Sequence, residues 1–211
     1  MRPRTADQAL ARLVEGNARF VRGAGRFPVV RKAALVGLAK RQQPYATILG
    51  CSDSRVPVEL VFDASLGELF IVRVAGNVVS PDVLGTLQFA AVYLRTPLFV
   101  VLGHEGCGAV QAALATMRDG VRPQARIARL LDKITPGLKP LSRDLTGEAL
   151  VRAAVEANVR WSMRKVLETP EARVLLADGV MTLRGAVYDL KTGRVRWLPE
   201  TRPAGLSRSN P

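Results

Sequence analysis

Three nearly continuous apolar runs alternate with helical patterns in the first half of the chain, and this alternation limits the possible folds most. The runs are "YATILG" (45–50), "ELFIVRVAG" (68–76) and "PLFVVLG" (97–103). Strands that are apolar on both faces are typical of parallel sheets covered by helices on each side. We therefore predict an α/β fold with a mainly parallel central sheet flanked by helices.

The segments between and after these runs carry helix signals. In "SPDVLGTLQFAAVYL", Ser80 is placed to cap a helix and Pro81 suits its first position. "CGAVQAALATM" after the third run also predicts a helix. Residues 121–178 are expected to be largely helical, with the clearest amphipathic pattern over 145–168.

The end of the chain carries a hairpin signal. "VMTLRGAVYDLKTGRVRWL" contains two alternating runs joined by Lys191, Thr192 and Gly193. Alternating runs joined by a short segment that contains glycine are typical of a β-hairpin. We expect this hairpin to extend the parallel sheet with an antiparallel strand at its edge.

The N-terminal segment "TADQALARLVEGNARFV" has apolar residues at helical spacing, and Thr5 with Gln8 predicts a capping box. A helix with one apolar face must lie on its own core or on a partner subunit. A second short helix is expected near 31–41. With 211 residues, 48% of them apolar, we predict a single domain overall. Within it, 1–41 forms an N-terminal helical arm and 42–211 the α/β domain.

Composition limits which binding partners and which cellular location we expect. The net charge of +13 is made mostly by scattered arginines, without the interleaved aromatic residues that stack on bases. A solvated surface is therefore favoured over a polyanion-binding patch, and no nucleic-acid partner is expected. No apolar run approaches the roughly 20 residues of a membrane span. The N-terminus lacks the pattern of a secretory signal, so a cytoplasmic location is expected, a removed leader aside.

Two polar loops follow two of the predicted strands. "CSDSR" follows 45–50, and "HEGCG" follows 97–103. Because ligands gather outside the carboxyl ends of parallel strands, we expect Cys51, His104 and Cys107 to lie close together. Two thiolates and an imidazole form a donor set that suits zinc. The plainer alternative is that the cysteines are inert buried residues.

Asp53 and Arg55 lie beside the first of these cysteines. Three protein ligands leave one position of a tetrahedral zinc open, and Asp53 is the residue that could fill it. Arg55 could instead hold the Asp53 carboxylate through two parallel hydrogen bonds. Asp53 would then decide whether water reaches the metal. An ordinary surface ion pair of little energetic consequence is the alternative.

The motifs "CSDSRVPVEL", "GELFIVRVAGN", "LGTLQFA", "GHEGCGAV" and "YDLKTGRV" resemble, in order and spacing, the β-class carbonic anhydrases. The resemblance extends from "GNARF" to the final hairpin. It implies one zinc ion per subunit held by Cys51, His104 and Cys107, with Asp53 and Arg55 as the catalytic dyad. It implies a lyase, carbonate dehydratase, which hydrates CO2 reversibly to bicarbonate and a proton by attack of zinc-bound hydroxide.

The resemblance also implies substrate-binding residues, which are Gln42, Phe70 and Gly108. It implies homodimers or homotetramers in which the N-terminal helix packs on the neighbouring subunit. One subgroup closes its site with the help of a Trp at the position of Ile48, so Ile48 favours the open subgroup. Glu105 stands where Ser is common in the family, and it could carry protons away or face solvent.

Two other functions remain open from the sequence. The same zinc site could serve a related hydrolase that acts on CS2 or COS. Alternatively, the chain could be a non-catalytic binding or regulatory protein stabilised by zinc. The latter predicts Asp53 as a permanent fourth ligand.

Overall fold

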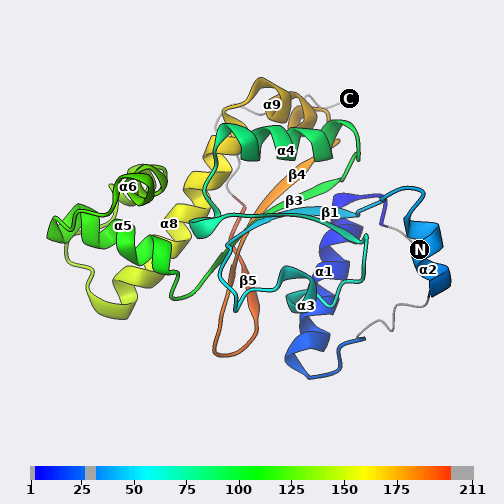
Figure 1. Ribbon diagram of the computed structural model, residues 1–211, viewed down its shortest axis with the longest axis horizontal. Helices are drawn as coiled ribbons and strands as arrows, with labels where there is room; N and C mark the ends of the chain where they lie inside the picture. Colours follow the sequence, from blue (N-terminus) through cyan, green and yellow to red (C-terminus); the bar gives the residue numbers. More distant parts are fainter. Residues whose placement is uncertain (1–2, 27–31, 201–211) are drawn as a thin grey trace.

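The computed structural model describes residues 3–26 and 32–200 (Figure 1). In this part of the chain, strands form one sheet in the order β2-β1-β3-β4-β5. Neighbours from β2 to β4 run parallel, and β5 is antiparallel to β4. The predicted parallel sheet with an antiparallel edge strand is therefore confirmed. The strands are β1 (Ala46–Gly50), β2 (Leu69–Arg73), β3 (Leu98–His104), β4 (Thr182–Tyr188) and β5 (Val195–Trp197).

Helices cover both faces of the sheet (Figure 1). α1 and α3 lie on one face, and α4, α5, α8 and α9 lie on the other. The described helices are α1 (Ala6–Val21), α2 (Lys32–Leu38), α3 (Val58–Val61), α4 (Pro81–Val92), α5 (Gly108–Asp119), α6 (Ala125–Leu131), α7 (Thr135–Leu138), α8 (Gly147–Leu167) and α9 (Pro170–Ala177), with a 3-10 turn η1 at Ala75–Asn77.

The central strands are apolar because each has helices above and below it. Every residue of β1 and β3 is buried. Leu49 and Val101 belong to the core between the sheet and α8. Ile48 and Val100 belong to the core on the opposite face, beside α1. Alternate side chains of a strand point to opposite faces, so both faces require apolar residues.

The helix caps confirm the local predictions. The Thr5 side chain accepts a hydrogen bond from the Gln8 backbone N–H, and the Gln8 side chain accepts one from the Thr5 N–H. The Ser80 side chain accepts from the Val83 N–H, with Pro81 at the first position of α4. One strand prediction was too long, because β2 ends at Arg73 and Gly76 has a positive φ of 66°.

The N-terminal helix α1 lies on the chain's own sheet. Ala9 and Leu13 are fully buried in the core beneath the sheet. Asn17 donates to the carbonyl oxygens of Val61 and Gly193 at 3.0 and 2.9 Å, which fastens α1 to α3 and the final hairpin. The expected contact with a partner subunit, the single-domain organisation and the arm boundary at residue 41 stay predictions. Residues 1–2, 27–31 and 201–211 of the predicted arm and domain lie outside the described residues.

The strand order places a switch point between β1 and β3. The chain leaves β1 for β2 on one side, whereas β3 lies on the other side. β1 ends at Gly50 and β3 at His104, so Cys51 and His104 lie at the carboxyl edge beside this switch point. None of the described helices is long and apolar enough to cross a bilayer.

Candidate metal centre

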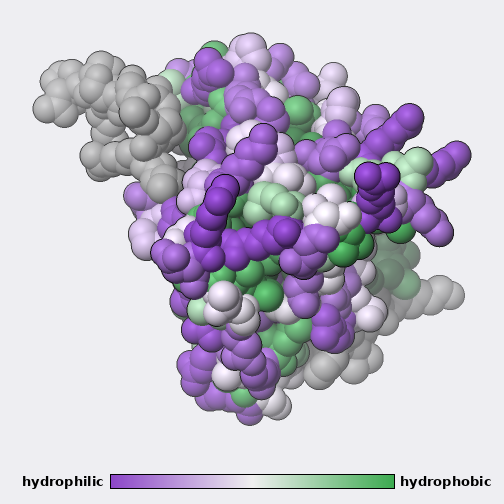
Figure 2. All heavy atoms as spheres, turned by 90° about the vertical axis from the view of Figure 1, so that its left-hand side faces the viewer, coloured by the Kyte–Doolittle hydropathy of each residue, from purple (hydrophilic) through white to green (hydrophobic). Residues whose placement is uncertain are grey.

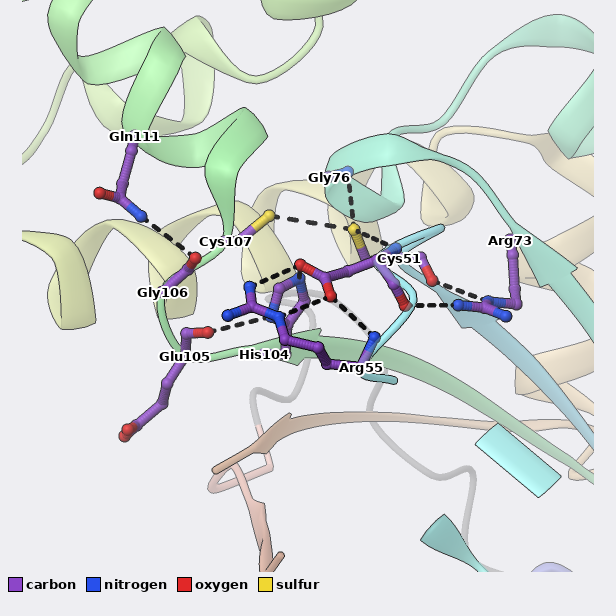
Figure 3. Close-up of polar contacts among 10 residues, drawn as sticks. Cys51, Arg55, Arg73, Gly76, His104, Glu105, Gly106, Cys107 and Gln111 are labelled. Atoms are coloured by element: carbon purple, nitrogen blue, oxygen red, sulfur yellow. Dashed lines mark hydrogen bonds and ion pairs between the residues drawn. The ribbon is translucent and has the colours of Figure 1, made fainter. Parts of the chain in front are cut away.

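Cys51, His104 and Cys107 converge at the carboxyl edge of the sheet (Figure 3). Cys51 directly follows β1, His104 is the last residue of β3, and Cys107 is the N-cap residue of α5. All three side chains are buried, and their ligand atoms lie within 4.8 Å of one another. The two Sγ atoms are 4.0 Å apart. The structure thus brings together the three residues that the sequence predicts as metal ligands.

His104 presents one ring nitrogen to this cluster. Its Nδ1 lies 3.0 Å from the Glu105 carbonyl oxygen. A carbonyl oxygen only accepts, so Nδ1 carries the proton and Nε2 keeps a lone pair. Among the described residues, the buried Nε2 has no hydrogen-bond partner. A buried polar atom without a partner is costly, and an imidazole oriented by a hydrogen bond from its other nitrogen is typical of a metal ligand.

The two cysteine thiols share one hydrogen bond, and their pKa values are shifted in opposite directions. Hydrogen bonds from the Cys107 thiol and from the backbone N–H groups of Asp53 and Gly76 lower the pKa of Cys51. The pKa of Cys107 is raised, because this thiol donates to Cys51 and is buried. N–H groups at the start of α5 act in the opposite direction on Cys107 but do not prevail. A bound divalent cation would hold both groups as thiolates.

The donor set fits zinc. Zn–S bonds of about 2.3 Å in a tetrahedral site place two sulfurs about 3.8 Å apart. The observed Sγ–Sγ distance of 4.0 Å is close to this value. Thiolate and imidazole are the preferred zinc ligands, and three of them leave one position for water. His104 Nε2, which has no hydrogen-bond partner among the described residues, would be the third ligand atom of such a site.

Asp53 is held by Arg55 at the edge of the cluster. Arg55 Nε donates to Asp53 Oδ1 at 2.9 Å, and Arg55 Nη2 donates to Oδ2 at 2.7 Å. The Arg55 backbone N–H also donates to Oδ1, at 3.0 Å. These bonds hold the pKa of the Asp53 carboxyl well below its ordinary value. Of the two positions that the sequence leaves open for Asp53, the structure has the one on Arg55.

Arg73 also belongs to the site, although the sequence did not point to it. Its Nε donates to the Cys51 carbonyl oxygen at 2.9 Å, and its Nη2 donates to the Asp53 carbonyl oxygen at 2.6 Å. Arg73 ends β2, and it is paired with Gly50 at the end of β1. It therefore supports the loop of Cys51 and Asp53 from the neighbouring strand (Figure 3). A cation at the end of a strand run is the signal that could have revealed it.

Gln42 and Phe70 do not approach the cluster of their own chain. Gln42 is exposed and precedes β1, whereas Cys51 follows it. Phe70 is paired with Thr47, near the amino end of β1. The five residues of β1 rise by about 16 Å, so these side chains lie at the opposite edge of the sheet. Gly108, in contrast, is exposed at the start of α5, directly after Cys107.

Glu105 turns away from the cluster (Figure 3). Its carboxylate Oε1 lies 4.0 Å from Nε of Arg152 on α8. Both side chains are accessible to solvent. This position favours the solvent-facing interpretation of Glu105 over a role in carrying protons from the site.

The fold and the site define an α/β protein with a buried Cys2His cluster that fits a metal ion at the switch point of its sheet. The family model described as carbonic anhydrase matches residues 46–195. The chain therefore belongs to the carbonic anhydrase family, and its structural neighbours place it in the β class.

Relatives cover most of the chain. It is 38% identical over 183 residues to carbonic anhydrase 2 of Mycobacterium tuberculosis, covering 86% of this chain and 87% of that protein. A β-carbonic anhydrase of Aspergillus fumigatus is similar in structure with a TM-score of 0.67, 29% identity and coverage of 93% and 92%. A β-carbonic anhydrase of Coccomyxa has a TM-score of 0.72, 25% identity and coverage of 90% and 86%.

Proposed function

We propose that the chain hydrates CO2 reversibly to bicarbonate and a proton, with one zinc ion per subunit held by Cys51, His104 and Cys107. The single observation that carries this proposal is the position of Asp53. Arg55 holds both of its carboxylate oxygens, which keeps Asp53 from serving as a fourth ligand. A zinc site with three protein ligands and an open position is typical of catalysis rather than of structure.

Asp53, Arg55 and Gly108 each have a separate role at this site. Zinc, when bound, lowers the pKa of water at its open position towards neutrality. Asp53 is placed to accept a hydrogen bond from that position, because its Oδ2 lies 3.8 Å from His104 Nε2. The Arg55 pair keeps Asp53 ionised, so it remains an acceptor through the neutral pH range. Gly108 is exposed at the start of α5. We expect its backbone N–H to donate to an anionic oxygen of the substrate.

The proton released by the reaction must leave without an imidazole shuttle. His104 is the only histidine of the chain, and as a metal ligand it could not carry protons. The Glu105 carboxylate faces Arg152 rather than the cluster. The Arg55 side chain is 59% exposed, so the Asp53–Arg55 side of the site is open to water. We therefore expect the proton to pass to solvent and buffer along this side.

Gln42 and Phe70 would contact substrate from a second copy of the chain. Phe70 stacks on Phe89 of α4, with ring centroids 6.3 Å apart, and Phe89 contacts Tyr93. Phe89 is 44% exposed and Tyr93 74% exposed. Gln42 lines the same surface depression as Tyr93. An exposed aromatic surface next to a polar side chain is typical of an interface, which supports a homodimer or a homotetramer built from dimers.

Other partners and locations are less favoured. The two cysteines are unpaired thiols, as a reducing compartment would keep them, and we propose a cytoplasmic location. Figure 2 shows hydrophilic side chains spread over the end of the molecule formed by α5, α6 and α8, with small hydrophobic patches among them. This distribution supports a solvated surface at that end of the molecule. That no nucleic acid binds stays a prediction from the scattered arginines of the sequence.

The competing functions are separated by one experiment. We would measure hydration of CO2 by stopped flow, and hydrolysis of COS and CS2, with the zinc-loaded wild type and Cys107→Ala. The proposal expects rapid CO2 hydration that Cys107→Ala loses. A wild type that converts COS or CS2 but not CO2 would instead identify the related hydrolase. No activity on any of the three would indicate a structural zinc.

A further inference from the structure

The 3-10 turn η1 (Ala75–Asn77) places a backbone N–H against the metal centre. The Gly76 N–H donates to Cys51 Sγ at 3.3 Å (Figure 3). Gly76 and Asn77 both have positive φ, 66° and 43°. A positive φ is uncommon for a residue other than glycine, and such a conformation persists only where its surroundings impose it. The direction of this N–H therefore depends on what holds the turn.

Two side chains of α8 hold the turn from one side. Asn158 Nδ2 donates to the Gly76 carbonyl oxygen at 2.8 Å. Ser162, one helical turn further, donates from Oγ to the Asn77 carbonyl oxygen at 3.0 Å, and Asn77 Nδ2 donates back to Ser162 Oγ at 3.4 Å. The carbonyl groups of Gly76 and Asn77, the two residues with positive φ, are thus both bonded to α8.

Apolar packing closes the other side of the turn. A Cβ on Gly76 would lie 2.7 Å from Cδ1 of Ile134 and 3.1 Å from Cβ of Ala109. Ala109 belongs to the first turn of α5, which directly follows Cys107. The turn is therefore held on one side by the hydrogen bonds from α8 and on the other by the side chains of Ile134 and Ala109. A shift of the turn would break the hydrogen bonds or clash with these side chains.

The two polar residues of α8, Asn158 and Ser162, are buried in a part of the core where polar side chains lower stability. Asn158 and Ser162 are each only 1% exposed, on a helix face that otherwise packs apolar residues on the sheet. Among the described residues, the Asn158 Oδ1 atom has no hydrogen-bond partner. A buried polar group that is only partly satisfied destabilises a core relative to an apolar side chain. Helix packing alone does not account for these two residues, whereas the turn at the metal centre does.

We propose that Asn158 and Ser162 are positioning residues for the metal centre, which fix the turn 75–77 so that the Gly76 N–H donates to Cys51 Sγ. This inference rests on the proposed metal site. A hydrogen bond to a ligating sulfur fixes its direction and stabilises its negative charge. Loss of such outer contacts typically lowers metal affinity or activity by about 10- to 100-fold.

The test compares variants on the same helix in the full-length protein. Asn158→Leu removes the donor to Gly76 at similar size, Ser162→Ala removes the hydroxyl, and Ser162→Thr keeps it. Val166→Ala is the matched control, because Val166 is buried on α8 but lies in the core with α9, beside Ala172. Zinc affinity is measured by competition with a chelator. The thiolate-to-cobalt charge-transfer absorption of the Co2+-loaded protein reports on the sulfur environment.

The proposal expects Asn158→Leu to bind zinc about 10- to 100-fold more weakly and to shift the cobalt absorption. Ser162→Ala should show a smaller change in the same direction, and Ser162→Thr should stay near the wild type. Val166→Ala should lower the melting temperature but keep both metal readouts. If Asn158→Leu does not fold, the comparison of Ser162→Ala with Ser162→Thr decides.

Two results would overturn the inference. One is wild-type zinc affinity and cobalt absorption in folded Asn158→Leu and in Ser162→Ala. The other is an equal loss of affinity in Val166→Ala, since that would be a general effect of destabilisation. Both readouts use the metal alone. A wild type that binds zinc but does not hydrate CO2 would therefore contradict the proposed function and leave the positioning role to be decided by the variants.

Discussion

Arg55 donates to both carboxylate oxygens of Asp53, from Nε to Oδ1 at 2.9 Å and from Nη2 to Oδ2 at 2.7 Å. Oδ2 also faces the cluster, 3.8 Å from His104 Nε2. Asp53 is thus fixed as a hydrogen-bond acceptor at the edge of the metal position. A planar guanidinium is required for this arrangement, because an ammonium group cannot offer two parallel N–H donors.

Substitution of Arg55 is expected to lower CO2 hydration while zinc stays bound. In Arg55→Ala, Asp53 loses the two side-chain hydrogen bonds that orient it and keeps only the one from the backbone N–H at position 55, so its carboxylate becomes free to turn towards the metal. We expect CO2 hydration to fall at least about tenfold, the low end of the usual effect of outer contacts at a metal site. Zinc content, measured by atomic absorption, should stay near that of the wild type.

Arg196→Ala is the matched control for Arg55→Ala. Arg196 is also half-exposed and paired with a carboxylate, that of Glu156, but it lies on the edge strand. Its removal should leave CO2 hydration unchanged. Equal rates for wild type and Arg55→Ala would mean that the Asp53–Arg55 pair is an ordinary surface ion pair.

The Asp53 carboxylate also links stability to pH. Hydrogen bonds from Arg55 hold the folded-state pKa of Asp53 below its ordinary value of 3.8. Its contribution to stability is therefore fully present above about pH 4 and is lost as the pH falls further, towards the folded-state pKa. Urea unfolding of the metal-free wild type and Asp53→Asn should show a constant difference in unfolding free energy from pH 7 to about pH 4. If the difference in unfolding free energy disappears between pH 7 and pH 5, the pKa of Asp53 in the folded protein is not lowered.

The conformation of Gly76 predicts a graded effect of two glycine substitutions. Gly76 and Gly106 both have positive φ, so alanine at either position is strained by about 1–2 kcal/mol. Only at Gly76 would the new Cβ also meet a neighbour, Ile134, at 2.7 Å. Overpacking of this kind costs about a further 1–3 kcal/mol. Chemical denaturation should therefore show that Gly76→Ala is less stable than Gly106→Ala by about the 1–3 kcal/mol of overpacking. Equal unfolding free energies of the two variants would contradict this prediction.

Gln42 is expected to act on the site of a neighbouring subunit. Gln42→Ala and Cys51→Ala homo-oligomers should each be slow in CO2 hydration. When the two variants are unfolded together and refolded, each mixed dimer contains one intact site, made of Cys51 from one copy and Gln42 from the other. Random pairing in a symmetric dimer gives about a quarter of the wild-type rate. No recovery in mixtures shown to contain hetero-oligomers would place Gln42 outside the partner's site.

The sequence predicts those parts of the site that follow from local pattern and sheet topology. Cys51 and His104 come directly after apolar strands, and the carboxyl ends of neighbouring parallel strands meet. Asp53 and Arg55 are two residues apart, so their pairing is also local. The sequence could not decide which partner Asp53 takes, since that depends on side-chain geometry.

The missing parts depend on contacts between distant segments. Arg73 reaches the Cys51 loop only because of the β1–β2 register. Asn158 contacts Gly76 across 82 residues of sequence, and on α8 it reads as one polar residue in an amphipathic pattern. The end of β2 was predicted too late because "VRVAG" continues the apolar run, whereas the positive φ of Gly76 starts a turn.

The role of Asp53 in the reaction is tested by measuring zinc content and CO2 hydration together, from pH 6 to 9, in the wild type and in Asp53→Asn. We predict one zinc per subunit in both proteins and a large loss of hydration in Asp53→Asn alone. Wild-type hydration rates in zinc-loaded Asp53→Asn would contradict this expectation, because the carboxylate held by Arg55 would then have no part in the reaction.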